Sequence, residues 1–357
     1  MTEENKQVRK EFSRLLMRWN QRKNNRQMPW KGEKDPYKIW LSEIILQQTR
    51  VEQGLAYYHR FIASFPTVNH LAEAHDSLVF KHWEGLGYYS RCRNLLASAR
   101  YISRQLGGRF PSGYEDIRAL KGVGPYTAAA IASFAYNLPY AVVDGNVFRV
   151  LSRVFGVSLP IDSTEGKKYF NTLAAEVLDK KKPGVYNQAI MDFGAMVCKP
   201  AAAACEACVF NKICFAFIHG KINELPVKEK KPATRKRYFY YLVMDYKGSF
   251  AIRQRNAKDI WNQLHEFPLI ETGGTKSKKE ILAEAEKQGL LPTHGDYEVV
   301  SSSEVFRQQL THQSITGQFI RVKLKKAITG DWNWISKKQR ARLAFPKFIN
   351  QYLQSEK

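Results

Sequence analysis

Four cysteines in one short segment are the feature that most constrains how this chain folds. Cys198, Cys205, Cys208 and Cys214 lie within 17 residues, in the spacing C-x6-C-x2-C-x5-C. This clustering is unlike a secreted disulfide framework, and in a reducing cytosol clustered cysteines more often bind metal. Four thiolates could hold a 4Fe–4S cluster or zinc, and free thiols are the remaining alternative. Only one C-x2-C pair is present, which favours the iron–sulfur cluster.

The charge of the chain indicates what kind of partner it binds. Its 56 lysines and arginines exceed its 33 acidic residues, for a net charge of +23. Such an excess favours a polyanion, with nucleic acid as the first interpretation. A basic enzyme of ordinary kind and an anionic membrane surface are the alternatives. The sequence contains no apolar run of about 20 residues and no signal-peptide pattern, so we expect a cytoplasmic protein without a membrane partner.

The hydrophobic pattern divides the chain into two domains. Residues 1–224 have apolar residues at helical spacing, which predicts an all-α domain. Residues 225–237, "LPVKEKKPATRKR", carry six basic residues and two prolines and predict an exposed linker. Residues 238–357 contain alternating strand patterns with helices, which predicts an α+β domain.

The segment "LKGVGPYTAAA", residues 120–130, predicts a tight turn that opens a helix. Gly122 and Gly124 allow a turn that side chains would block, and Pro125 suits the first helical position. The free amides of Gly122, Val123 and Gly124 would then form an anion site for a DNA phosphate. A plain turn between two helices is the alternative, and the carbonyl groups of the turn could also hold a cation.

Asp144 follows the apolar run "AVV" and precedes the helical pattern "NVFRVLSRVFG". Its position predicts an N-cap, because an aspartate side chain accepts hydrogen bonds from the first free amides of a helix. It also suggests a carboxylate that faces the same ligand as the glycine hairpin. The two roles are compatible.

The glycine hairpin, Asp144 and the cysteine spacing together resemble the endonuclease III superfamily of helix-hairpin-helix DNA glycosylases. The segments "MPWKGEKDPYKIWLSEIILQQTRV", "WEGLGYYSRCRNL", "VDGNVFRVLSR" and "NQAIMDFGAMVC" are most similar to adenine DNA glycosylases of the MutY type. The resemblance covers residues 8–220 well. It implies a 4Fe–4S cluster on the four cysteines. It also implies a monomer that acts on double-stranded DNA with adenine opposite 8-oxoguanine or guanine.

The resemblance implies roles for four residues in hydrolysis of the adenine N-glycosidic bond. Glu43 matches the acid that protonates adenine, and its apolar neighbours would keep its carboxyl protonated near neutral pH. Asp144 matches the carboxylate that stabilises the oxocarbenium-like sugar. Tyr126 and Asn146 match residues that position the carboxylates or the water. A solvated glutamate on a helix is the alternative for Glu43.

Other residues match the family's substrate contacts. Those expected around the extruded adenine, by family match, are Arg26, Trp30, Leu46, Val51 and Gln188. Those expected on the DNA are Lys31, Gln48, Tyr88 and Arg91, with Gln48 and Tyr88 as the wedge that splits the mispair. Trp30 and Leu46 could instead be ordinary core residues.

The second domain resembles the subfamily's Nudix-like domain less closely. Aligned with the family's His-x-Phe-Ser-His loop, Leu310, Thr311 and His312 are expected to read 8-oxoguanine, and Gln308 replaces the first histidine. A hairpin loop with incidental polar residues is the alternative. A Glu-rich Nudix metal motif is missing from the sequence, so we expect no pyrophosphatase activity.

Two other functions compete with a monofunctional glycosylase. A bifunctional endonuclease III-like enzyme would need an amine for a Schiff base, but Tyr126 occupies the place of that family's lyase lysine. A non-catalytic protein that only binds lesions would not need both Glu43 and Asp144. The sequence therefore predicts an enzyme that removes the base and does not cut the strand.

Overall fold

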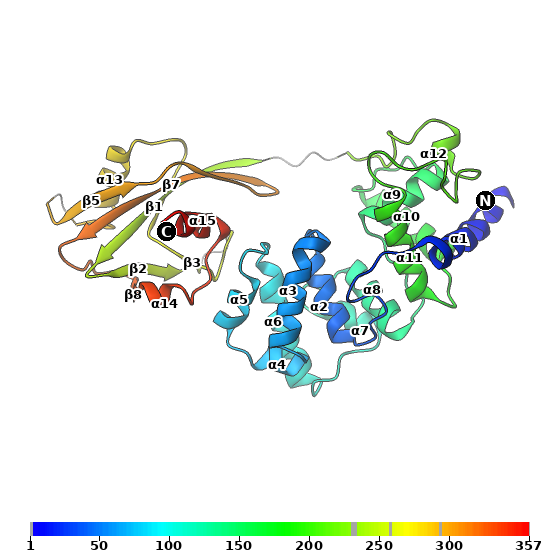
Figure 1. Ribbon diagram of the computed structural model, residues 1–357, viewed down its shortest axis with the longest axis horizontal. Helices are drawn as coiled ribbons and strands as arrows, with labels where there is room; N and C mark the ends of the chain where they lie inside the picture. Colours follow the sequence, from blue (N-terminus) through cyan, green and yellow to red (C-terminus); the bar gives the residue numbers. More distant parts are fainter. Residues whose placement is uncertain (1–2, 230–233, 257–258, 293–294, 357) are drawn as a thin grey trace. The chain divides into compact units, whose positions relative to one another are not determined.

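The protein is described here from a computed structural model that covers residues 3–229, 234–256, 259–292 and 295–356 (Figure 1). The chain folds into two compact units. Unit 1 contains Met1–Glu73 and Asn94–Lys230, and unit 2 contains Ala74–Arg93 and Lys231–Lys357. Sequence analysis placed residues 74–93 with the helical domain, whereas their contacts group them with the C-terminal residues. For example, Lys81 Nζ donates to the Leu343 carbonyl oxygen at 2.9 Å.

Helices make up the first part of the chain, as the sequence predicts. Their bounds are α1 (Glu3–Lys23), α2 (Pro36–Leu46), α3 (Val51–Ser64), α4 (Val68–Glu73), α5 (Asp76–Trp83), α6 (Ser90–Gln105), α7 (Tyr114–Ala119), α8 (Pro125–Tyr136), α9 (Gly145–Phe155), α10 (Thr164–Val177), α11 (Pro183–Met196) and α12 (Phe215–Ile218). In the part of the chain that the structure describes, no helix has the length and apolar character needed to cross a bilayer.

Local sequence determines where the helices around the site begin. Asp35 caps α2 by accepting from the Tyr37 amide at 2.9 Å, and Asp144 caps α9 by accepting from the Val147 amide at 2.8 Å. Pro125 occupies the first position of α8, where the missing N–H costs no hydrogen bond. The predicted N-cap at Asp144 and the predicted Pro125 position are both confirmed.

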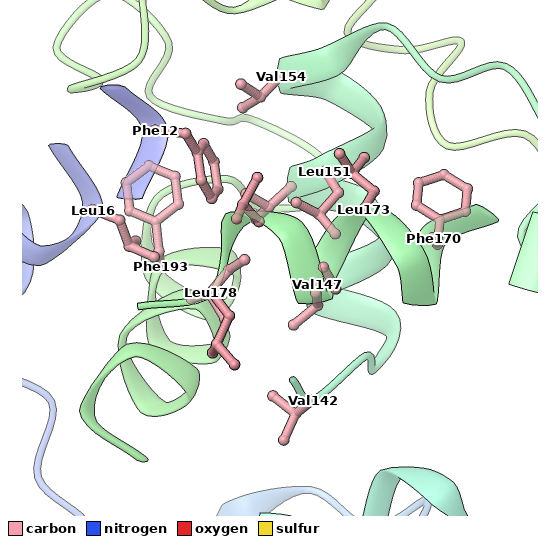
Figure 2. Close-up of a cluster of buried hydrophobic side chains, with 14 of the residues drawn as sticks. Phe12, Leu16, Val142, Val147, Leu151, Val154, Phe170, Leu173, Leu178 and Phe193 are labelled. Atoms are coloured by element: carbon pink, nitrogen blue, oxygen red, sulfur yellow. The ribbon is translucent and has the colours of Figure 1, made fainter. Parts of the chain in front are cut away.

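A buried apolar cluster joins α1 to the helices that carry the site (Figure 2). Phe12 and Leu16 of α1 pack in the same cluster as Val147 and Leu151 of α9 and Phe193 of α11, and all five are at most 1% exposed. The helix predicted from the pattern "NVFRVLSRVFG" is therefore confirmed as α9, with an apolar face in the core. The close approach of α9 and α11 depends on Gly194, since a Cβ there would lie 2.7 Å from the Asn146 Cβ.

The second part of the chain is α+β, as predicted. Its elements are β1 (Arg235–Tyr246), β2 (Ser249–Gln254), β3 (His265–Glu266), β4 (Leu269–Thr272), α13 (Lys278–Lys287), β5 (Tyr297–Ser302), β6 (Phe306–Gln309), β7 (Gln313–Leu324), β8 (Asn333–Ser336), α14 (Lys337–Arg340) and α15 (Lys347–Ser355). Strand β1 pairs in parallel with β7 from Arg235↔Gln313 to Asp245↔Lys323, and antiparallel with β2 and β4. The sheet is therefore mixed.

The predicted exposed linker, 225–237, is too long at both ends. Leu225 is 4% exposed and its carbonyl oxygen accepts from the Arg153 Nε at 3.0 Å, so the start of the segment packs on the helices. Arg235 already begins β1, and Arg237 is 5% exposed within it. Residues 230–233 of the linker lie outside the described residues. The domain bounds 1–224 and 238–357 remain predictions.

Candidate active site

A cavity of about 240 Å³ opens in unit 1 beside α2, α8 and α11. Its lining is more apolar than polar and includes Trp30, Ile39 and Phe134. Glu43 contributes a carboxyl group and Gln188 an amide. A space of this size, where polar and charged groups stand among apolar side chains, suits a small ligand.

Glu43 is the buried acid of this cavity. It lies on α2, between the fully buried Leu41 and Ile45, and is only 6% exposed. Burial raises the pKa of its carboxyl to about 7, because the apolar surroundings disfavour the charged form. The charge of Asp144 raises this pKa further, and a hydrogen bond from the Tyr126 hydroxyl opposes the rise. Glu43 therefore carries a transferable proton near neutral pH.

Tyr126 connects the glycine hairpin to the two carboxyls. It is the second residue of α8, and burial together with the charges of Glu43 and Asp144 raises the pKa of its phenol well above 10. The phenol thus stays protonated and donates to Glu43, while Met191 Sδ lies 3.9 Å from the same oxygen. Tyr126 can position Glu43, but it cannot act as a base near neutral pH.

Asp144 is held by several donors at the start of α9. Its Oδ1 accepts from the Val147 amide at 2.8 Å, and its Oδ2 accepts from the Asn146 Nδ2 at 2.9 Å. Burial raises the pKa of Asp144 above its ordinary value, and these hydrogen bonds and the Arg149 charge limit the rise. Donors of this kind stabilise the ionised form and fix its direction. The site thus combines a buried acid with a hydrogen-bonded carboxylate.

Arg149 connects Asp144 to the cysteine segment. It is 9% exposed, and its Nη2 donates to Asn146 Oδ1 and to the Gly194 carbonyl oxygen, both at 2.8 Å. Its Nε donates to the Cys198 carbonyl oxygen at 2.7 Å. One guanidinium therefore holds Asn146, α11 and the first cysteine in a fixed arrangement. The sequence prediction missed this residue.

The four cysteines lie in one loop that packs on the core. Arg153 Nη1 lies 3.6 Å from Cys198 Sγ, and the Phe210 amide donates to Cys208 Sγ at 3.4 Å. Burial raises the pKa of the Cys208 thiol, the Phe210 amide opposes the rise, and the charges of the other three cysteines raise this pKa further. A cation and an amide directed at thiolates suit a negatively charged iron–sulfur cluster. Among the residues that the structure describes, no three histidine, cysteine, aspartate or glutamate side chains are grouped so that they could hold a metal ion.

Comparison with known proteins shows the family to which the chain belongs. The model of the HhH-GPD superfamily, base excision DNA repair proteins, matches residues 41–176, and a NUDIX domain model matches residues 239–355. An adenine DNA glycosylase of Buchnera aphidicola from Acyrthosiphon pisum is 34% identical over 272 residues, which cover 76% of each chain. The chain belongs to the adenine DNA glycosylase family. The protein is therefore a DNA glycosylase of base excision repair.

Other relatives and solved structures extend this comparison. The mouse adenine DNA glycosylase is 39% identical over 226 residues, which cover 60% of this chain and 44% of the mouse protein. The structure of a thermostable thymine-DNA glycosylase matches with a TM-score of 0.56 and 29% identity over 60% of this chain and 98% of that one. An endonuclease III–DNA complex, at 16% identity and a TM-score of 0.51, covers 59% of this chain and 97% of its own and shares the fold.

The residues predicted from this family around the adenine do not all line the cavity. Trp30 and Gln188 line it, as does Lys31, which was assigned to the DNA. Arg26 does not line the cavity, but it forms an ion pair with Asp192, which accepts a hydrogen bond from the lining residue Gln188. The lining does not include Leu46 and Val51, which lie at the end of α2 and the start of α3. The sequence prediction missed Asn20, Ser42 and Val185, which also line the cavity.

The two predicted wedge residues share an unusual backbone conformation. Gln48 has φ 55° and Tyr88 has φ 48°, and both side chains are exposed. Few residues other than glycine adopt the left-handed region, and such strain is concentrated at functional sites. Both residues therefore present exposed side chains from a strained backbone, and their insertion into a duplex remains a prediction.

Arg91, predicted to contact DNA, is mostly buried instead. It is 8% exposed, and its guanidinium lies over the rings of Trp83 and Tyr88, at 5.3 and 5.4 Å. Burial lowers the pKa of Arg91 to about 10. This geometry favours support of the Tyr88 ring over contact with a phosphate.

The glycine hairpin forms the predicted turn, with one difference. Gly122 has φ 82°, and a Cβ there would lie 2.7 Å from the Asn94 Cβ, so glycine is required. Gly124 has an ordinary φ of −88° and open space around its Cα, so the turn itself does not need glycine there. Close approach of a ligand would explain Gly124 better. The phosphate and cation sites remain predictions.

The segment predicted to read 8-oxoguanine forms the turn between β6 and β7. Leu310 donates its amide to the Gln313 carbonyl oxygen at 2.7 Å, and the His312 carbonyl oxygen accepts from the Arg235 amide at 2.9 Å. Within unit 2, the Thr311 hydroxyl hydrogen-bonds to that of Tyr88. Unit 2 therefore brings a predicted wedge residue together with a predicted reader of the opposite base.

Proposed function

We propose that this protein hydrolyses the N-glycosidic bond of adenine mispaired with 8-oxoguanine or guanine in duplex DNA. The observation that best supports this proposal is the pair of carboxyls in different environments. Glu43 lies in an apolar cavity and has a pKa of about 7, whereas Asp144 accepts hydrogen bonds at a helix start. Enzymes that cleave glycosidic bonds use one protonated and one ionised carboxyl in this way.

The adenine must leave the duplex before it can reach Glu43. Nucleobases inside the helix are inaccessible, so enzymes that act on them extrude the nucleotide. Gln48 and Tyr88 are proposed to fill the space that the adenine leaves. The cavity of about 240 Å³ would receive the flipped base.

The reaction then divides between the two carboxyls. Glu43 transfers its proton to the adenine ring, which makes the base a better leaving group. The bond from the sugar C1′ to the base breaks, and Asp144 stabilises the positive charge that develops on the sugar. Water adds to C1′ and its proton returns to a carboxylate, so the products are free adenine and an abasic sugar. Tyr126 and Asn146 hold the two carboxyls in place.

A 4Fe–4S cluster is proposed on Cys198, Cys205, Cys208 and Cys214. Arg153 and the Phe210 amide would compensate its negative charge. When bound, the cluster would cross-link the loop and could supply one-electron chemistry. Arg149 would then join this loop to Asn146 and Asp144, since it contacts the Cys198 carbonyl oxygen.

The β6–β7 turn is proposed to recognise the base opposite the adenine. Leu310, Thr311 and His312 would cover that base, and the Thr311 hydroxyl can pair with the altered edge of 8-oxoguanine. Gln308 lies on β6, and its Oε1 is buried without a hydrogen-bond partner among the described residues.

Base release under single-turnover conditions tests the proposal. Duplexes with A:8-oxoguanine, A:G and A:T pairs are mixed with excess enzyme, and free adenine is quantified over time. We expect release from the first two duplexes and little from A:T. Equal release from all three would contradict recognition of the mispair, and no release would contradict the function itself.

Treatment with borohydride distinguishes this function from a bifunctional one. A lyase forms a Schiff base that borohydride converts to a covalent enzyme–DNA complex. We expect little trapping with an A:8-oxoguanine duplex, because Tyr126 stands at the position of the lyase amine. Efficient trapping that depends on a lysine near the hairpin would indicate the bifunctional chemistry.

A further inference from the structure

Asp192 is a buried charge that the proposed mechanism does not use. It lies on α11, one turn after Gln188, and its side chain has no exposed surface. A buried carboxylate is costly unless donors surround it. Four side chains donate to Asp192, two to each oxygen. Arg26 Nη1 and Gln188 Nε2 contact Oδ1, both at 2.9 Å, while Asn24 Nδ2 and Lys31 Nζ contact Oδ2 at 2.9 and 3.1 Å.

Two of these donors belong to the wall of the cavity, and the other two lie outside it. Lys31 and Gln188 line it, and Asn24 and Arg26 lie in the connection between α1 and α2. Asp192 therefore joins this connection to α11 at the cavity. Two cations and two amides satisfy the acceptor capacity of its carboxylate, which accounts for its burial without solvent.

The carboxylate also determines which way the Gln188 amide points. An ionised carboxylate only accepts hydrogen bonds, so the atom of Gln188 that lies 2.9 Å from Asp192 Oδ1 must be the amide nitrogen. The amide oxygen is then free of that contact and available to the cavity. Its preferred partner is a hydrogen-bond donor.

We propose that Asp192 is a positioning residue that determines base specificity through Gln188. This inference rests on the proposed function. With its oxygen toward the cavity, Gln188 accepts from the 6-amino group of adenine. Hypoxanthine and guanine carry an oxygen at the same position, which would face the Gln188 oxygen without a proton between them. A site that pairs a buried polar group with one base rejects the base that leaves the group unpaired.

Asp192→Asn tests the proposal because asparagine has the shape of aspartate but carries a donor NH2 group in place of one acceptor oxygen. The introduced asparagine can accept or donate a hydrogen bond. The Gln188 amide can therefore flip, which exchanges the positions of its oxygen and its nitrogen. The measurement is single-turnover release of adenine and of hypoxanthine, each opposite 8-oxoguanine in the same duplex. We expect the adenine-to-hypoxanthine rate ratio to fall roughly tenfold or more in Asp192→Asn. An unchanged ratio would overturn the proposal.

Two control variants separate positioning from structural support. Asn24→Ala removes a donor from the other carboxylate oxygen and should leave the ratio unchanged. In a Gln188→Ala background, Asp192→Asn should produce no further change of the ratio, because the amide that it acts through is gone. A further fall of the same size in that background would show that Asp192 does not act through Gln188.

A second variant, in which the amide and the carboxylate exchange positions, keeps the test decisive if Asp192→Asn alone folds poorly. The double variant Gln188→Glu with Asp192→Asn preserves the total charge, and the introduced asparagine can donate to the introduced glutamate. The ratio should then return toward the wild-type value, whereas a ratio as low as that of Gln188→Ala would overturn the proposal. Wild-type enzyme that releases no adenine would instead overturn the proposed function itself.

Discussion

At the scale of single residues, the chemistry depends on the environment of Glu43. Its carboxyl has an ordinary pKa of 4.5, which rises to about 7 in the folded protein because burial disfavours the charge. Proton donation to a base requires the protonated form. The rate of adenine release should therefore be highest below pH 7 and fall as the pH rises through 7.

Glu43→Gln should separate activity from stability. The variant lacks a transferable proton, so base release should be lost while binding to DNA persists. The protonated carboxyl favours the folded state below about pH 4.5, and this contribution is lost as the pH rises through about 7. At pH 8 the neutral glutamine should thus stabilise the fold by up to about 3 kcal/mol. Denaturant unfolding at pH 4.5 and 8 measures the difference, and equal gains at both values would contradict the assignment.

Tyr126→Phe should shift the pH dependence of the reaction. The Tyr126 hydroxyl lowers the pKa of Glu43 by donating to its carboxylate, so removal of the hydroxyl should raise that pKa. The decline in rate at high pH should then begin at a higher pH, with a lower maximum rate because Glu43 is held less firmly. Tyr37→Phe is the matched control, since the buried Tyr37 hydroxyl donates to the Phe65 carbonyl oxygen instead. A decline at unchanged pH in Tyr126→Phe would disprove the coupling.

At the scale of elements, the aromatic side chain of Phe210 anchors the cysteine loop in the core. Phe210 has no exposed surface, stacks on Phe12 of α1 at 4.7 Å between ring centroids, and packs edge-on against Phe193 of α11 at 4.9 Å. The loop between Cys208 and Cys214 is thereby anchored in the core that carries Asp144.

Phe210→Ala should release this loop and weaken the proposed cluster. Truncation of a buried phenylalanine costs about 3–5 kcal/mol. We expect lower thermal stability and a lower iron content per protein, measured by iron analysis and visible absorbance. Phe217→Ala on α12 is the control, because Phe217 is 37% exposed and its loss should have little effect. Full iron content in Phe210→Ala would show that the loop does not need this anchor.

At the scale of the whole molecule, the excess of positive charge should govern DNA binding. The net charge of +23 is large enough for many contacts with DNA phosphates. Each phosphate that the protein neutralises releases a counterion into solution. The dissociation constant for a duplex with an A:8-oxoguanine pair should therefore increase steeply between about 50 and 200 mM salt. Fluorescence anisotropy measures this dissociation constant. A constant that does not change with salt would argue against contacts with the DNA phosphates.

The division between the units shows where sequence reasoning reaches its limit. Residues 74–93 contain α5 and the start of α6, as expected from the helical spacing of residues 1–224. Periodicity does not reveal that Glu84 accepts from the Phe345 amide at 2.8 Å, or that this segment groups with the C-terminal residues. Glu84 and Phe345 are 261 positions apart, and no local pattern encodes such a contact.

The sequence by itself determined the local features of this protein. Caps, turns and helix starts depend on neighbouring residues, so Asp144, Pro125 and the Gly122 turn could be predicted from a few letters each. The tertiary structure alone decided the electrostatics of the site. The pKa of Glu43, the burial of Arg91 and the donors around Asp192 all depend on side chains brought together by packing. Desolvation and hydrogen bonding act through space, which is why the residues were predictable while their protonation and orientation were not.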